Sequence, residues 1–97
     1  VYTNVGIEEV SNVISRVHLY PNPVLAPAFH IEITSTEKGI LQLEILDMAG
    51  KKLLSQAASL QLGHNLMNVN VDLARGAYLY RLTFNGTVFK NGKLIRH

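Results

Sequence analysis

Hydrophobic and polar residues alternate from Phe29 almost to the C-terminus, and this period of two restricts the fold more than any other feature. In the first run, Phe29, Ile31 and Ile33 alternate with polar residues. Successive side chains of a strand point to opposite faces of a sheet, so such a run predicts a strand with one apolar face. Similar runs occupy residues 40–46, 63–71, 77–84 and 87–96. The chain is therefore expected to consist of short strands.

Turn-forming residues separate these runs. After residue 46, the Asp47 side chain can accept hydrogen bonds from backbone amides of the turn, and Gly50 can adopt the left-handed conformation of a tight connection. Asn85 and Gly86 stand between two alternating runs, which is the strongest short-range signal for a β-hairpin. We therefore expect neighbouring strands to pair as hairpins.

The number and length of the predicted strands determine the fold class. With a first strand at residues 17–20 and a return strand starting at Leu53 and Leu54, the chain has seven short strands. Parallel strands need long crossovers, and no helix is predicted between these strands. The sequence therefore predicts an all-β fold, a seven-stranded antiparallel immunoglobulin-like β-sandwich. Its 97 residues suit one domain, which we place at residues 17–97.

Residues 1–16 are predicted to be a linker. Hydrophobic residues recur at a helix-like interval within residues 5–17, but valine, isoleucine, serine and asparagine are poor helix formers. We therefore expect a mainly extended segment. Because the chain starts at Val1, without a methionine or a signal-peptide pattern, we also expect it to be part of a longer protein.

Composition excludes several classes of protein. With 47% hydrophobic and 16% charged residues, the chain is not a disordered polyelectrolyte. Without cysteine it has neither disulfides nor thiolate metal ligands. Residues 1–72 carry a net charge of −3 and residues 73–97 a net charge of +5, but these basic residues are too dispersed to predict nucleic-acid binding. No apolar run approaches the roughly 20 residues that span a bilayer, so no membrane insertion is expected.

Residues that could carry chemistry are scattered. The four histidines, at positions 18, 30, 64 and 97, lack the spacing of a metal site, and His30 falls on the polar side of its strand. The serines form no nucleophile elbow and the carboxylates no evident acid–base pair. Tyr78 and Tyr80 share a face with Leu82 and Phe84, which predicts a role in the core. We therefore expect no enzyme activity, no metal and no cofactor.

Several short motifs follow one another in a recognisable order. They are Leu19-Tyr20-Pro21-Asn22-Pro23, Leu46-Asp47-Met48-Ala49-Gly50-Lys51-Lys52, Gly63-His64-Asn65, Leu73-Ala74-Arg75-Gly76-Ala77-Tyr78 and Gly92-Lys93-Leu94-Ile95-Arg96. Each motif alone is weak, but the ordered set is specific. Over roughly residues 18–96 the chain resembles the C-terminal sorting domain of the type IX secretion system.

The resemblance implies a function in transport. Domains of this family follow an unrelated cargo in the same chain, which a signal peptide takes to the periplasm of a Gram-negative bacterium. The outer-membrane translocon and its associated shuttle proteins then recognise the domain, and the cargo reaches the cell surface or the extracellular medium. A sortase-like surface peptidase usually removes the domain. For this chain, the resemblance points to processing within or near residues 1–16.

The motif residues divide into two groups. We interpret most of them as mainly structural, because prolines fix backbone angles and glycines permit tight turns: Pro21, Asn22, Pro23, Asp47, Gly50, Gly63, Gly76 and Tyr78. The basic and apolar ending is harder to explain by packing, so we assign translocon recognition to Lys93, Leu94, Ile95 and Arg96.

The expected register of the last hairpin refines this assignment. A two-residue loop at Asn85 and Gly86 would place Lys93 on the core side, opposite Tyr78. Burying an unpaired ammonium group is unfavourable. We therefore predict a β-bulge at residues 91–92 that turns Leu94 inward beneath Tyr78 and leaves Lys93 and Ile95 outside.

Two other functions fit a small β-sandwich. An extracellular adhesion or carbohydrate-binding module would need an exposed aromatic or acidic ligand site, and the absence of tryptophan weakens that interpretation. A structural spacer of immunoglobulin type would explain the strands but not the basic ending. Secretion of the cargo without this domain would favour the spacer, and glycan binding by the isolated domain would favour the module.

Overall fold

The computed structural model describes residues 13–22, 24 and 27–97. Its elements are seven strands, as predicted. In chain order they are β1 (Ile14–Tyr20), β2 (Ala28–Ser35), β3 (Gly39–Leu46), β4 (Lys52–Leu60), β5 (Gly63–Asn70), β6 (Gly76–Phe84) and β7 (Thr87–Arg96). Among the described residues, no helix is long and apolar enough to cross a membrane.

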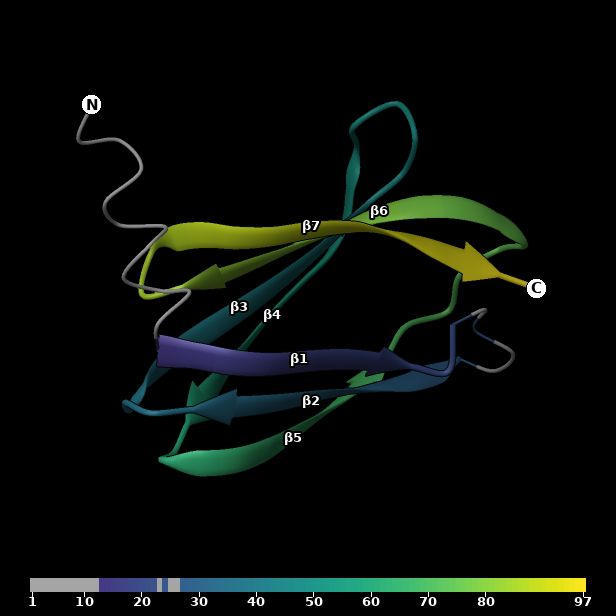
Figure 1. The fold of residues 1–97 in the computed structure, drawn as a ribbon. Coiled ribbons are helices and arrows are strands. Elements are labelled where there is room, and N and C mark those ends of the chain that lie inside the picture. Colours follow the sequence, from purple (N-terminus) through teal and green to yellow (C-terminus); the bar gives the residue numbers. More distant parts are fainter. Residues whose placement is uncertain (1–12, 23, 25–26) are drawn as a thin grey trace.

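The strands form two sheets that lie one above the other (Figure 1). One sheet has the order β1-β2-β5 and the other the order β4-β3-β6-β7. All neighbours within a sheet are antiparallel. The prediction of an all-β antiparallel sandwich is confirmed.

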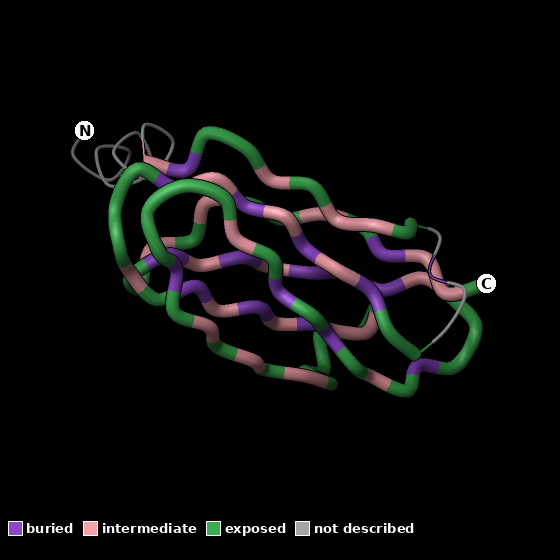
Figure 2. Tube along the Cα trace, turned by 90° about the horizontal axis from the view of Figure 1, so that it is seen from below, coloured by how far each residue is buried: buried purple, intermediate pink, exposed green. Residues whose placement is uncertain are grey.

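The core lies between the inner faces of the two sheets. Phe29, Ile31 and Ile33 are fully buried, and the polar residues between them are not. Figure 2 shows the same alternation of buried and more exposed positions along the other strands. Tyr78 and Tyr80 belong to this core, as their period of two predicted. Apolar burial on one face of each strand therefore determines which face is turned inward.

The predicted turns are present. The Asp47 carboxylate accepts hydrogen bonds from the backbone N–H groups of Ala49 and Lys51, at 3.0 and 2.8 Å. Gly50 has a φ of 90°, a conformation that a residue with a side chain rarely adopts. Asn85 and Gly86 both have positive φ, as a two-residue hairpin turn of type I′ requires.

Strand β1 begins at Ile14, three residues before the predicted start at Val17. Ile14 is buried in the core, and the carbonyl oxygen of Val13 accepts a hydrogen bond from the Thr36 N–H at 2.9 Å. Residues 14–16 are therefore extended and belong to the sandwich. The rest of the predicted linker, up to residue 12, lies outside the described residues.

The last hairpin contains a β-bulge, but the predicted position is wrong. Its pairing shifts between Leu82 and Thr83, which makes Phe89 the extra residue on β7. The predicted bulge at residues 91–92 does not form.

Packing against Tyr80 explains why the bulge comes earlier. Gly92 lies opposite Tyr80, and a side chain at residue 92 would collide with the tyrosine ring. The register must therefore shift before Gly92, and the bulge lets Phe89 pack against the core. The expected consequence is confirmed, because Leu94 is fully buried opposite Tyr78 while Lys93 is exposed.

Candidate recognition site on the C-terminal strand

The predicted recognition residues alternate between the core and the outer face of the larger sheet. Leu94 is buried, so it cannot touch a partner in the folded domain. Lys93 is exposed opposite Leu79, and Ile95 is half-buried opposite Ala77. Of the apolar residues in the motif, Ile95 alone is therefore on the outer face.

Asn22 holds the free edge of β7. Its side-chain Nδ2 donates to the carbonyl oxygen of Lys93 at 3.1 Å, and its Oδ1 accepts from the Ile95 N–H at 3.2 Å. A residue of a parallel neighbouring strand would offer β7 a donor and an acceptor in the same pattern, and the bridge between Val24 and Arg96 is parallel. One asparagine side chain thus takes the place of a strand and joins two motifs that are 71 residues apart.

Val24 continues this contact towards the C-terminus. Its N–H donates to the Ile95 carbonyl at 2.6 Å, and its carbonyl accepts from the His97 N–H at 3.0 Å. The Arg96 guanidinium donates to the carbonyls of Val24 and His97, at 3.5 and 2.6 Å. Arg96 is half-buried and tied to the backbone, so its contacts are structural. We call Asn22 and Val24 the edge clamp.

The edge clamp restricts how a partner can approach this strand. Unpaired strand edges are templates for pairing with another chain. Between Lys93 and His97, the clamp already occupies edge groups of the backbone. A partner that reads this part of the folded domain must therefore contact side chains on the outer face, where Lys93 and Ile95 lie.

We expect Asn22→Ala to loosen the end of β7. The substitution removes two hydrogen bonds, so the free energy of unfolding should fall by about 1 to 2 kcal/mol. The Ile95 amide should also exchange with solvent faster, as hydrogen-exchange NMR would detect. Asn70→Ala is the matched control, because its exposed side chain makes no hydrogen bond within the described part of the chain. Equal effects of the two substitutions would contradict the clamp.

The other motif residues have structural roles in the described chain. The Tyr78 hydroxyl donates to the Ala74 carbonyl at 2.5 Å, which fixes the loop before β6. Gly76 has a φ of 150° with open space around it, so its backbone conformation rather than crowding favours glycine. Gly63 also has positive φ. The Tyr20–Pro21 peptide bond is cis, and Pro23 lies outside the described residues.

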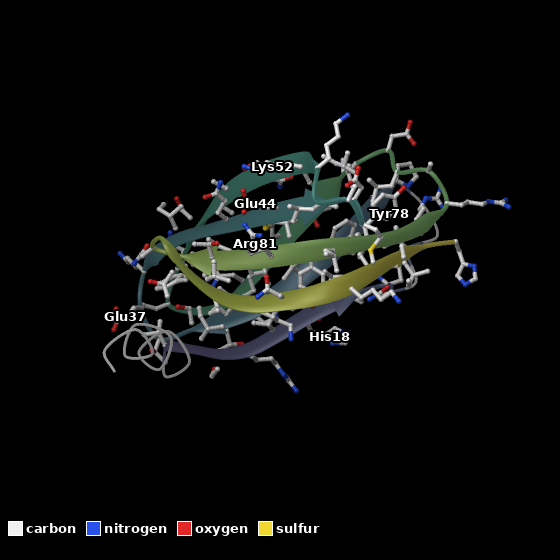
Figure 3. The ribbon with its side chains drawn as sticks, turned by 90° about the horizontal axis from the view of Figure 1, so that it is seen from above. His18, Glu37, Glu44, Lys52, Tyr78 and Arg81 are labelled. Atoms are coloured by element: carbon white, nitrogen blue, oxygen red, sulfur yellow. The ribbon has the colours of Figure 1, made fainter. Side chains whose placement is uncertain are left out.

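A small ion network lies beside Lys93 on the outer face of the larger sheet. Glu44 of β3 contacts the Lys52 Nζ of β4 at 2.7 Å and the Arg81 Nη1 of β6 at 3.2 Å (Figure 3). The hydrogen bond from Lys52, with the charge of Arg81 added, holds the pKa of the Glu44 carboxyl below its usual range. Only 13% of the Glu44 side chain is exposed. The two cations therefore cover the carboxylate and present positive charge outward.

The outer face of the smaller sheet is polar instead. His64 Nε2–H donates to Glu32 at 2.8 Å, and His30 Nδ1–H donates to Asn68 at 2.7 Å. The hydrogen bond from His64 lowers the pKa of Glu32, whereas burial and the nearby Glu32 raise the pKa of Tyr20. Within the described residues, no three histidine or carboxylate side chains are arranged to bind a metal ion.

Sequence reasoning missed two features of this site. It treated Pro21, Asn22 and Pro23 as a local backbone device, because nothing near them in the chain indicates a contact with β7. It also did not pair Glu44 with Lys52 and Arg81. The available signal was opposite charge on neighbouring strands, since Arg81 faces Glu44 and Lys52 lies diagonally across from it.

Known proteins share both the sequence pattern and the fold. The family model described as "Secretion system C-terminal sorting domain" matches residues 18–96. A search of curated proteins gives no match. Dimeric latent PorU from Porphyromonas gingivalis contains a similar structure, with a TM-score of 0.70 and 24% identity over 82% of this chain and 9% of the PorU chain. The DNA glycosylase AlkC from Pseudomonas fluorescens matches with a TM-score of 0.54 and 15% identity, covering 88% of this chain and 30% of AlkC.

These structural similarities support the fold alone, whereas the family match spans most of the chain. Domains of this kind are continuous with an upstream cargo and interact with the secretion machinery, and the family is generally non-catalytic. Their cargo is exported to the cell surface or the extracellular space. With its motifs and its antiparallel sandwich in agreement with this match, the chain belongs to the family of type IX secretion C-terminal sorting domains.

Proposed function

We propose that this domain directs the cargo that precedes it from the periplasm through the outer-membrane translocon, and that a surface peptidase then removes it. The observation that carries the proposal is the family match over residues 18–96. The domain acts by being recognised, and its sandwich keeps the recognised side chains in a fixed geometry. Translocon components and shuttle proteins are its partners in this proposal.

Removal of the domain would require a cut before residue 13. Between Val13 and Tyr20 the backbone is hydrogen-bonded to β2 or to the connection that follows it. A peptidase needs an extended, unpaired segment around the scissile bond, and paired strands resist cleavage until they open locally. We therefore place the processing site before Val13, so that residues 13–16 no longer belong to the expected range of residues 1–16.

The direct test of this function is to delete residues 17–97 from the full-length protein in its own host. We expect the cargo to stop in the periplasm, because the signal for outer-membrane transport is gone. Cell fractionation and immunoblotting would measure its distribution. Normal secretion of the truncated cargo would contradict the proposal and would favour a spacer.

Within this function, we assign recognition to the outward side chains Lys93 and Ile95. Replacing both by serine should prevent the export of most of the cargo that carries the domain. It should leave the sandwich folded, since neither side chain belongs to the buried core. Deletion of residues 93–97 is a poorer test, because it also removes the buried Leu94 and partners of the edge clamp.

The matched control is the pair Val88→Ser and Lys90→Ser. It also removes one apolar and one basic side chain from the exposed surface of β7, but at positions that precede Lys93. We expect this control to be exported normally. Equal export of both double variants would contradict the assignment to Lys93 and Ile95.

A further inference from the structure

Lys93 and Ile95 are at the margin of a wider apolar area on the larger sheet. Across the sheet, Lys93 lies opposite Leu79, and Leu79 lies opposite Leu46. All three belong to the outer face, since a neighbour of each residue along its own strand is buried in the core: Ile45, Tyr78 and Leu94. Leu79 is 40% exposed, and Leu53 at the start of β4 is 39% exposed. Apolar side chains from several strands therefore lie at the solvent surface beside Lys93 and Ile95.

A shallow depression marks the middle of this area. It encloses about 360 Å³ and is lined by Leu46, Gly50, Leu79, Tyr80, Arg81, Asn91 and Gly92. Gly92 and Tyr80 line the depression from two paired strands, whereas Leu46, Leu79, Arg81 and Asn91 belong to the outer face itself. Small side chains of a partner could enter such a depression, which a flat sheet face would not allow.

The charges around the depression have mainly one sign. Lys52, Arg81 and Lys93 carry positive charge, and Glu44 is the carboxylate that faces them. Glu44 is already bound by Lys52 and Arg81, so these four side chains together keep two positive charges. Lys93 makes no ion pair within the described part of the chain. A partner surface that complements this face needs apolar side chains flanked by carboxylates.

The opposite sheet is more polar. Its outer face carries Arg16, His18, Glu32 and His64, with Leu66 as its exposed leucine. Several leucines beside lysine and arginine therefore distinguish the larger sheet.

We propose that the outer face formed by Leu46, Leu53, Leu79, Lys93 and Ile95 is a docking surface for an acidic, apolar polypeptide segment of the export machinery. This inference rests on the proposed export function and adds the extent of the contact and the chemistry of the partner. Docking occurs through side chains on the sheet face, because the edge clamp occupies the end of β7. Leucine at the centre supplies apolar area, and Lys93 supplies charge at the rim.

The test uses the full-length protein, secreted by its own host, with Leu53→Thr and Leu79→Thr combined. Threonine keeps the strand propensity of these positions while removing apolar area. We expect export to fall about tenfold, the size of effect that central interface residues produce. Leu66→Thr, on the other sheet, is the matched control and should be exported normally. If the double variant fails to fold, Leu79→Thr alone replaces it, with folding checked by circular dichroism.

Charge is tested separately at Lys93. Export of Lys93→Glu should be lower than export of Lys93→Ser, because a carboxylate would repel an acidic partner and a serine would not. Equal export of the two variants would overturn the acidic character of the partner. If the wild-type protein and the leucine double variant are exported equally well, the proposed docking surface is wrong, whereas the transport function still stands. Failure of wild-type export to depend on the domain would instead reject the function itself.

Two other occupants of the face can be distinguished directly. Binding of residues 1–97 to vesicles of anionic phospholipid, lost in Leu79→Thr, would identify a membrane surface and overturn the polypeptide partner. A dimer in sedimentation equilibrium that dissociates in Leu79→Thr would identify a second copy of the chain and also overturn it. We expect the isolated domain to remain monomeric and not to bind the vesicles.

Discussion

Replacing Leu94 by alanine is expected to lower the free energy of unfolding by about 2 to 5 kcal/mol, as large-to-small substitutions in protein cores do. Leu94 is fully buried opposite Tyr78 and belongs to the core cluster. Alanine would leave a cavity between the two sheets, which neighbouring side chains fill only in part. Urea denaturation monitored by circular dichroism would measure the loss.

Lys93→Ala is the internal control for this prediction. Lys93 is next in the chain but exposed, and surface substitutions usually change stability by less than about 0.5 kcal/mol. The two substitutions should therefore differ strongly in stability, although both fall within the recognition motif. Equal losses of stability would mean that β7 does not alternate between core and surface as described.

The contrast between these neighbours separates a structural role from the recognition that we propose for this motif. A run of four residues contains a core anchor, a backbone-bound arginine and two outward side chains. Variants at Leu94 or Arg96 that block export would act through folding or through the clamp. Variants at Lys93 test contact with a partner. Stability and export must therefore be measured together for every variant of this strand.

The strands were predictable because each carries its own evidence. Burial of Phe29, Ile31 and Ile33 follows from alternation within one segment, and the turn at Asp47 and Gly50 follows from the properties of those two residues. Local patterns of this kind need no knowledge of distant parts of the chain. The outward direction of Lys93 was predictable for a related reason, because an unpaired ammonium group is unfavourable in a core.

The features that escaped prediction depend on contacts between distant residues. Asn22 reaches β7 across 71 positions of sequence, and the local Pro21-Asn22-Pro23 pattern does not reveal that contact. The position of the bulge depends on where the Tyr80 ring lies, which requires the pairing of Tyr80 with Gly92 to be known. The first strand began earlier than predicted because Ile14 packs in the core, and the helix-like spacing of its neighbours concealed this.

Transfer of export to an unrelated protein is the second large effect that we expect. A reporter that normally remains in the periplasm should cross the outer membrane when residues 1–97 are fused behind it, in a host with a type IX secretion system. The fusion contains the motifs and the sandwich, so the reporter itself needs no signal for transport across the outer membrane. The same fusion with Lys93 and Ile95 replaced by serine should remain in the periplasm while its sorting domain stays folded.

The amount of this reporter outside the cell, compared with the amount in the periplasm, tests the central claim most directly. The fusion should be found at the cell surface or in the medium of the competent host, and in the periplasm of a host that lacks the translocon. The reporter without the domain should remain in the periplasm of both hosts. Retention of a folded fusion in the periplasm of the competent host would contradict the claim that this domain is a sorting signal.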